Sequence, residues 1–360
     1  MRVIHVVEAF GGGIYTFLQR LTLEDDKNEH IVVYSRRTET PDSVELDFPN
    51  ISLIPVNMQR EISILEDIKS CIDLKRQIQK INPDIIHAHS SKAGVYVRLL
   101  SLIDRDKIPV IYNPHGLSFL QQNESFFKRN IYLYIERVLT VLVPQAIYIG
   151  VSEQEYQEIQ FKLKSKNLYL IRNAVVPKKI EEKEKIFDFV TLGRICKQKN
   201  PQLFNQLALK YPHKKFLWIG DGEEREFLNS PNIEVSGWLQ DKKKIESLLE
   251  SSRIYVQFSL WEGLPLALLE AMSCGLPCLV TECIGVKEVI ERSQNGKVIN
   301  YNLQNIESIV NDLEEKYSWY SKSSINSIKD YYNVANMIKG YQNLYEEVKK
   351  NAIKYSSTSL

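Results

Sequence analysis

The stretch SLWEGLPLALLEAMSCGLPCLVTE, residues 259–282, is the part of the chain that says most about its fold. An apolar run at Ile254–Phe258 comes before it and predicts a buried strand. Pro265 can begin a helix, and Gly275 can end that helix before a second apolar run at Cys278–Val280. A strand, a helix and a second strand in this order indicate a parallel sheet covered by helices.

The same alternation of apolar runs and amphipathic segments extends over the rest of the chain. In the first half the predicted strands are Val3–Val7, His30–Tyr34, Ile85–Ala88, Val110–Asn113 and Ala146–Val151. In the second half they are Phe189–Leu192, Phe216–Ile219, Ile233–Val235, Ile254–Phe258 and Cys278–Val280. We therefore expect an α/β protein whose parallel sheets are covered on both faces.

A charged segment divides the two series of strands. Residues 176–188 read VPKKIEEKEKIFD, a composition typical of a linker. The chain has 360 residues, and single cores stop growing at roughly 250–300 residues. We expect one domain over residues 1–175 and a second over residues 176–332, followed by an amphipathic helix at residues 333–354.

Composition argues against several classes of protein. The 46 Lys and Arg against 45 Asp and Glu give a net charge of +1, which disfavours a dedicated nucleic-acid binder. Five cysteines are few and odd in number, so we expect a reducing compartment and no disulfide framework. Met1 leads directly into the first predicted strand, so we expect no cleavable leader. The most apolar helical stretch, residues 131–149, contains charged residues and is not expected to span a bilayer.

Two cations lie where a helix dipole disfavours them. The segment LGRICKQKNP places Arg194 and Lys199 between the end of a strand and Asn200-Pro201, which are typical of an N-cap and a first helical turn. Positive charge near a helix N-terminus is slightly unfavourable. We interpret the pair as a site for an anion such as a diphosphate; the alternative is two solvated loop charges.

Two carboxylates belong to the stretch quoted first. Glu262 follows a predicted strand, and Glu270 is the only charged residue in a helix made otherwise of Leu, Ala and Met. A carboxylate in so apolar a helix is costly unless it has a partner. Sugar hydroxyls suit it, because an ionised carboxylate accepts two hydrogen bonds and fixes their direction. The alternative for Glu270 is a salt bridge to an Arg or Lys elsewhere.

Further candidates lie in the first half of the chain. The glycines of Gly11–Gly13 could bring backbone amides to an anion, or form a plain flexible turn. His115 lies just after the end of a predicted strand and could contact a substrate hydroxyl or move a proton, with a structural histidine as the alternative. We expect the rings of His87 and His89 to lie on opposite faces of a strand, which disfavours a shared metal. Asp104-Arg105-Asp106 has no third ligand in view, so no metal site is predicted.

These residues together resemble the family-four retaining glycosyltransferases of the GT-B fold. Glu262 and Glu270 are separated by seven residues, as in that family's E-x7-E signature. The segments GRICKQKNP, IGDGEEREFL, IYNPHG and DIIHAHS also resemble the family, in the expected order. The resemblance implies two Rossmann-like domains with parallel sheets facing a central cleft, and a terminal helix that packs back on the N-terminal, acceptor-side domain.

The resemblance also implies roles for the candidate residues. A nucleotide sugar would lie mainly on the C-terminal domain, with its diphosphate and its hydroxyls held by the cations and carboxylates described above. For catalysis the implied residues are His115, Arg194, Lys199 and Glu262. For substrate binding they are Gly12, Gly13, Arg194, Lys199, Gly263, Leu264 and Glu270.

The implied reaction transfers a sugar from a nucleotide-diphosphate donor to a saccharide or a lipid-linked saccharide. The resemblance further implies retention of configuration, no metal or other cofactor, and a place in the biosynthesis of bacterial capsule, exopolysaccharide or O-antigen. A nucleotide-sugar 2-epimerase of the same fold and a catalytically silent sugar-binding protein are the alternatives.

The segment Ser125–Val143 mixes aromatic with basic side chains, which suits the interface of an anionic membrane. An ordinary helix facing the core is the alternative. We therefore expect a cytoplasmic protein, with peripheral attachment to the inner face of the cell membrane as one of two options.

Overall fold

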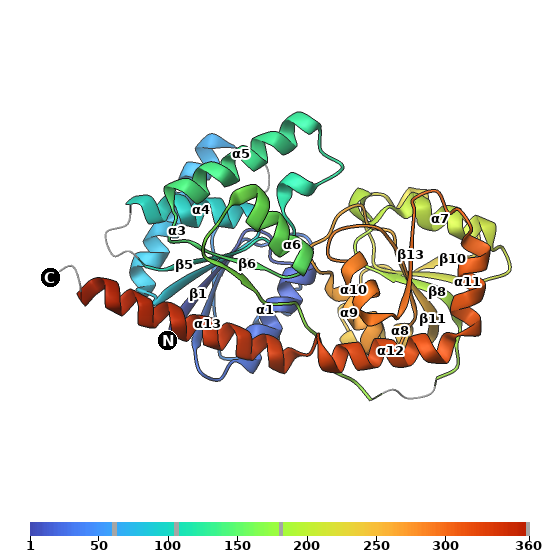
Figure 1. The fold of residues 1–360 in the computed structure, drawn as a ribbon. Helices are drawn as coiled ribbons and strands as arrows, with labels where there is room; N and C mark the ends of the chain where they lie inside the picture. Colours follow the sequence, from blue (N-terminus) through green and yellow to red (C-terminus); the bar gives the residue numbers. More distant parts are fainter. Residues whose placement is uncertain (60–62, 104–107, 180–182, 358–360) are drawn as a thin grey trace. The chain divides into compact units, whose positions relative to one another are not determined.

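The computed structural model describes residues 1–59, 63–103, 108–179 and 183–357 of the chain. The chain forms two compact units, each built on a parallel sheet of its own (Figure 1). Unit 1 comprises Met1–Leu120, Glu124–Arg172 and Ala335–Leu360, and unit 2 comprises Gln121–Asn123 and Asn173–Val334. The predicted turn at Asp104-Arg105-Asp106 lies outside the described residues.

Unit 1 contains a seven-stranded sheet. Its strands are β1 (Arg2–Val7), β2 (Glu29–Tyr34), β3 (Ser52–Pro55), β4 (Ile85–His89), β5 (Val110–Asn113), β6 (Ile147–Gly150) and β7 (Leu168–Leu170). Its longer helices are α1 (Gly12–Glu24), α3 (Ile64–Ile81), α4 (Ser91–Ile103), α5 (Phe126–Leu142) and α13 (Val334–Ser357), and its shorter ones are α2 (Val44–Asp47), η1 (Ser118–Leu120), α6 (Glu153–Glu158) and η2 (Ile159–Leu163). The strand order is β3-β2-β1-β4-β5-β6-β7, and all neighbours are parallel.

Helices cover both faces of this sheet, which explains why its central strands are apolar along their whole length. In Figure 1, α3, α4 and α5 lie on one face, and α1 and α13 lie on the other. The terminal helix α13 belongs to unit 1: Asn113 Nδ2 donates to Tyr341 Oη at 2.9 Å from the end of β5.

Unit 2 contains a six-stranded sheet. Its strands are β8 (Phe187–Leu192), β9 (Phe216–Ile219), β10 (Ile233–Val235), β11 (Ser252–Gln257), β12 (Cys278–Thr281) and β13 (Gly296–Ile299). Its helices are η3 (Lys197–Lys199), α7 (Pro201–Lys210), η4 (Arg225–Phe227), α8 (Lys242–Glu250), α9 (Leu266–Ser273), α10 (Lys287–Ser293), α11 (Ile306–Glu315) and α12 (Tyr317–Asp330). The order β10-β9-β8-β11-β12-β13 makes β8 and β11 neighbours, and all pairs are parallel.

The predicted α/β architecture is confirmed, and each of the ten predicted strands lies within two residues of an observed one. The prediction missed β3, β7 and β13, which are edge strands of three or four residues. Edge strands are half exposed and need no continuous apolar run, so they give a weak signal. The stretch 131–149 is not one helix: α5 ends at Leu142, before Pro144, and β6 starts at Ile147.

Candidate active site

The loops after β8 and β11 bring a cation and a carboxylate together at one edge of the unit 2 sheet. Lys199 ends the short helix η3 after β8, and Glu262 lies in the loop after β11. Because β8 and β11 are parallel neighbours, their carboxyl ends meet at the same edge. Lys199 Nζ lies 2.6 Å from Glu262 Oε1, and the two side chains are only 18% and 10% exposed. The residues therefore form a largely buried ion pair.

Gln198 joins the same two loops through its backbone and its side chain. Its carbonyl accepts from the Leu260 amide at 2.8 Å, and its Nε2 donates to the Trp261 carbonyl at 2.8 Å. Gln198 could not be singled out from the sequence, because a neutral amide in a loop has no distinctive signature. These bonds fix the approach of Lys199 to Glu262.

The backbone of Gly263 and Leu264 is held from two sides. Asn173 Nδ2 donates to the Leu264 carbonyl at 2.7 Å. On the other side, Gly285 has φ +75°, and a Cβ atom there would lie 1.5 Å from the Gly263 carbonyl oxygen. Only glycine fits so close an approach with a positive φ. The predicted contact segment is thus positioned by two residues that sequence reasoning did not assign to the site.

Glu270 lies on the least buried stripe of α9. Of the eight residues of this helix, only Ala267 and Glu270 are not buried, and residues three apart share a helix face. Burial, followed by Cys278, Glu262 and Glu270, raises the pKa of the Tyr255 phenol well above its usual range. The two carboxylates therefore add to the burial that keeps this phenol protonated.

Arg194 lies two residues after the end of β8, in the loop where the sequence places it. Arg194 and Glu270 each interact with another group of the protein. The predicted N-cap is confirmed, since the Asn200 side chain accepts from the Leu203 amide and Pro201 begins α7.

The thiol of Cys283 is inert beside the ion pair. Burial and the charge of Glu262 raise its pKa, and Lys199 only partly opposes that effect. A thiol that stays protonated is a poor nucleophile. The electrostatics of this site therefore rest on Lys199, Arg194 and the carboxylates.

In unit 1, the glycine loop begins α1 with its backbone uncovered. Gly11 is the N-cap residue and offers no side-chain hydrogen bond, and Gly12 has φ +53°. A Cβ atom at Gly12 or Gly13 would meet no atom within 4 Å. The first amides of this helix can thus be approached closely by another molecule.

His115 lies just after β5 in a constrained conformation. Its φ is +52°, a value that residues other than glycine rarely adopt. The amide of Gly116 donates to Glu155 Oε1 at 2.7 Å, and the Val151 amide donates to the other oxygen at 2.9 Å. Glu155 was not predicted, since its spacing from Ser152 indicates only a helix cap. This buried carboxylate fixes the loop that carries His115.

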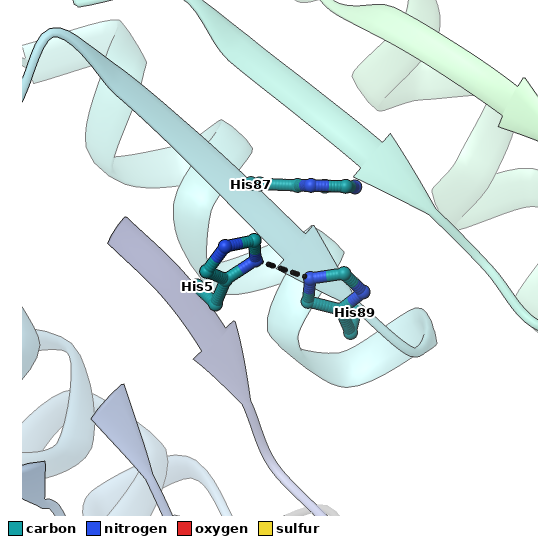
Figure 2. Close-up of side chains that lie close together, drawn as sticks. All are labelled: His5, His87 and His89. Carbon is teal, nitrogen blue, oxygen red and sulfur yellow. Dashed lines mark hydrogen bonds between the residues drawn. The ribbon is translucent and has the colours of Figure 1, made fainter. Parts of the chain in front are cut away.

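The expectation for His87 and His89 was wrong. Successive residues of a strand alternate between faces, so residues two apart share a face. The rings of His87 and His89 lie on one face with centroids 4.1 Å apart, and His5 of β1 joins them (Figure 2). One ring nitrogen from each lies within 4.8 Å of the others, and all three side chains are buried. By atom type and spacing, this is the group of described residues that could hold a metal ion.

Helix α5 has a core-facing side and an exposed aromatic side. Glu136, Leu139 and Thr140 are buried, whereas Phe126 is 82% and Phe127 75% exposed. The expectation of a core-facing helix is therefore confirmed for one side of α5, and membrane contact by the other side stays a prediction. Among the described helices, none combines the length and apolar character needed to cross a bilayer.

Two family models match the chain. The model described as "Glycosyltransferase Family 4" matches residues 11–179, and the one described as "Glycosyl transferases group 1" matches residues 187–317. The two matches fall on the two halves of the chain.

Individual proteins match over most of its length. A UDP-Gal:alpha-D-GlcNAc-diphosphoundecaprenol alpha-1,3-galactosyltransferase of Escherichia coli is 29% identical over 81% of this chain and 82% of its own. The O-antigen biosynthesis glycosyltransferase WbnH of Escherichia coli is 23% identical over 78% and 81%. The crystal structure of Anabaena Alr3699/HepE in complex with UDP-glucose has a TM-score of 0.77 at 15% identity, covering 96% of this chain and all of that one. That likeness shows a shared fold.

Proposed function

We propose a specific reaction for this chain, which belongs to the family 4 glycosyltransferases and has the GT-B fold. It transfers a sugar from a uridine diphosphate donor to a lipid-linked saccharide, in the biosynthesis of a bacterial surface polysaccharide. The names of the two Escherichia coli relatives and the UDP-glucose complex of the structural neighbour support this choice. The observation that carries it is the largely buried pair of Lys199 and Glu262 at the carboxyl edge of the unit 2 sheet.

Unit 2 is the donor side in this proposal. Breaking the bond between the sugar and the diphosphate leaves negative charge on the diphosphate. Lys199 and Arg194 stabilise that charge in this proposal, and preorganised charge of this kind is often the largest catalytic contribution. Lys199 uses part of its ammonium group on Glu262 and has three donors in all, so further N–H groups can bind phosphate oxygens.

The carboxylates orient the two ends of the donor. Glu262 accepts hydroxyl hydrogen bonds from the transferred sugar, and the backbone of Gly263 and Leu264 contacts the sugar and its phosphate. Glu270, on the least buried stripe of α9, accepts hydrogen bonds from the ribose hydroxyls. An ionised carboxylate has several acceptor positions, so each can bind hydroxyls in a fixed direction.

Unit 1 is the acceptor side. His115 contacts the sugar. The uncovered backbone amides at Gly12 and Gly13 also bind substrate. The reaction proceeds with retention of the anomeric configuration. It needs no metal, because Lys199 and Arg194 supply the positive charge. The lipid part of the acceptor lies near a membrane surface that the exposed aromatic side of α5 contacts.

The release of UDP tests this function. The purified chain is incubated with UDP-galactose or UDP-glucose, with and without GlcNAc-diphosphoundecaprenol, and in the presence or absence of EDTA. We expect UDP release that requires the lipid-linked acceptor and is unchanged by EDTA. Acceptor-independent conversion of the donor would support the epimerase instead, and donor binding without any release would support a silent sugar-binding protein.

A further inference from the structure

A continuous chain of hydrogen bonds joins a buried carboxylate to His115 through three other histidines. Asp25 Oδ2 lies 3.1 Å from His30 Nε2, and His30 Nδ1 lies 2.9 Å from His5 Nε2. His5 Nδ1 lies 3.0 Å from His89 Nε2, the bond drawn in Figure 2. His89 Nδ1 lies 3.1 Å from His115 Nε2. We call these five residues the histidine relay.

Strand register builds the relay. His30 on β2 pairs with Val3, two residues before His5 on β1, and His89 on β4 pairs with Val7, two residues after it. The three histidines therefore share one face of the sheet. Aromatic side chains of α1 and α13 pack on this face, so His5, His30 and His89 are buried.

Asp25 is the fixed end of the relay. Besides His30, its buried carboxylate accepts from the Lys27 amide at 3.1 Å, Asn28 Nδ2 at 2.7 Å and Gln342 Nε2 at 2.8 Å. Burial alone would raise the pKa of Asp25, but these hydrogen bonds outweigh it and hold the pKa well below its usual range. An ionised carboxylate only accepts, so His30 must donate from Nε2.

The direction of every other bond follows, because a neutral imidazole has one N–H and one lone pair. Burial lowers the pKa of His5 and His89 well below the usual range and that of His115 to about 3, so these rings are neutral near pH 7. His30 Nδ1 then accepts from His5, His5 Nδ1 accepts from His89, and His89 Nδ1 accepts from Nε2–H of His115. The lone pair of His115 is left on Nδ1.

A second proton on His30 would reverse every bond and leave the N–H of His115 on Nδ1. The tautomer of His115 therefore tells the two directions of the relay apart.

The Nδ1 atom of His115 is available to a ligand. It forms no hydrogen bond with another residue that the structure describes, and His115 as a whole residue is only partly buried. Phe17 packs edge-on against the ring with centroids 4.6 Å apart, and the bond from Gly116 to Glu155 holds the strained backbone. Strained residues held by their surroundings cluster at functional sites.

We propose that Asp25, acting through His30, His5 and His89, holds His115 in the tautomer protonated on Nε2, so that Nδ1 accepts a hydrogen bond from a hydroxyl of the sugar substrate. That this hydroxyl belongs to a sugar rests on the proposed function. Asp25, His30, His5 and His89 are positioning residues, and only His115 touches the substrate.

A metal at His5, His87 and His89 is the competing use of the same side chains. Both ring nitrogens of His5 and both of His89 are already engaged in the relay. Of the three residues, only His87 has a nitrogen without a partner, namely Nε2, while its Nδ1 lies 2.9 Å from Tyr345 Oη. A metal would have to break the bond between His5 and His89, so the relay accounts better for this geometry.

Nitrogen-15 NMR of the histidine rings in the full chain, without substrate, tests the tautomer directly. We expect His115 to be protonated on Nε2 and not on Nδ1. His5→Leu cuts the relay and should give His115 a mixture of tautomers. His87→Leu is the matched control, because His87 is equally buried on the same face but lies outside the relay. His5→Gln offers a donor and an acceptor in the required order and should restore the wild-type tautomer.

Turnover adds a second readout. With the UDP-sugar and lipid acceptor, kcat of His5→Leu should fall by about ten- to a hundredfold, as expected for a misplaced hydrogen bond. His87→Leu and His5→Gln should remain within about threefold of wild type. If His5→Leu does not fold, the wild-type spectrum and His5→Gln still decide the question.

Three results would overturn the relay. They are a wild-type His115 protonated on Nδ1, equal losses in His5→Leu and His87→Leu, or a stoichiometric metal found by mass spectrometry whose removal changes the ring signals. The tautomer is measured without turnover, so an inactive protein with the expected tautomer would count against the proposed function and leave the relay standing.

Discussion

At the residue scale, the candidate site depends on Lys199 and Glu262, which lie 63 positions apart in the chain. The sequence indicated Lys199 as a ligand of the diphosphate and Glu262 as a ligand of the sugar. It did not predict that they contact each other, because that contact requires β8 and β11 to be neighbours, and strand order is not visible in local patterns. The histidines show the same limit, since their contacts arise from the register of three strands.

Lys199→Ala should lower kcat by about 10²–10³-fold, because it removes a fixed charge from the leaving diphosphate. Lys197→Ala is the matched control, since Lys197 belongs to the same short helix but is exposed. Initial rates of UDP release with saturating acceptor give the comparison. Equal rates in the two variants would remove Lys199 from the site.

The buried histidines should make the fold sensitive to acid. Burial lowers the pKa of His5, His87, His89 and His115, so below about pH 6.5 the unfolded chain binds more protons than the folded one. Stability therefore falls as the pH falls, by up to about 1.4 kcal/mol per pH unit for each group. Urea unfolding at pH 7 and pH 5 should give a midpoint that is clearly lower at pH 5. Unchanged midpoints would mean that these rings titrate normally in the folded protein.

At the element scale, the strand–helix alternation predicted the architecture because central parallel strands must be apolar on both faces. Edge strands need not be apolar on both faces. The edge strands β3, β7 and β13 were missed for this reason. The close approach of Gly285 to Gly263 could not be predicted from the sequence either. A glycine in a loop can serve a turn, a positive φ or a close contact, and the sequence does not say which.

Gly285→Ala should disrupt the loop that contacts the donor. Its Cβ atom would collide with the Gly263 backbone, whereas at Gly237, with a similar φ of +71°, the nearest atom lies at 3.9 Å. Gly237→Ala should therefore show only the backbone cost of about 1–2 kcal/mol, and Gly285→Ala should lose more stability and raise KM for the donor. Thermal unfolding and donor titration of both variants measure this; a Gly285→Ala protein no worse than Gly237→Ala would contradict the account of this loop.

The exposed side of α5 should bind anionic membranes. Replacing Phe126 and Phe127 by serine should weaken partitioning onto phosphatidylglycerol vesicles at least about tenfold, because each buried phenylalanine contributes about 1.5–3 kcal/mol. Leu46→Ser changes a residue that is 83% exposed on α2 and serves as control. Vesicle co-sedimentation gives both values, and equal partitioning of the two variants would exclude α5 as the contact.

At the scale of the whole molecule, length and the restart of the strand pattern after residue 188 predicted two sheets, and the chain forms two. The assignment of donor to unit 2 and acceptor to unit 1 is a proposal that rests on which loops carry charge. The cations and acidic side chains of the candidate site lie in unit 2, and the glycine loop and His115 lie in unit 1.

Hydrogen–deuterium exchange of the whole chain, with and without saturating UDP-galactose or UDP-glucose, tests whether the donor binds the loops of unit 2. We predict that one of these donors slows amide exchange in residues 193–199 and 259–264, because the diphosphate and sugar order the loops that carry Lys199 and Glu262. Slower exchange confined to unit 1, with these two loops of unit 2 unchanged by a donor that binds, would contradict the account.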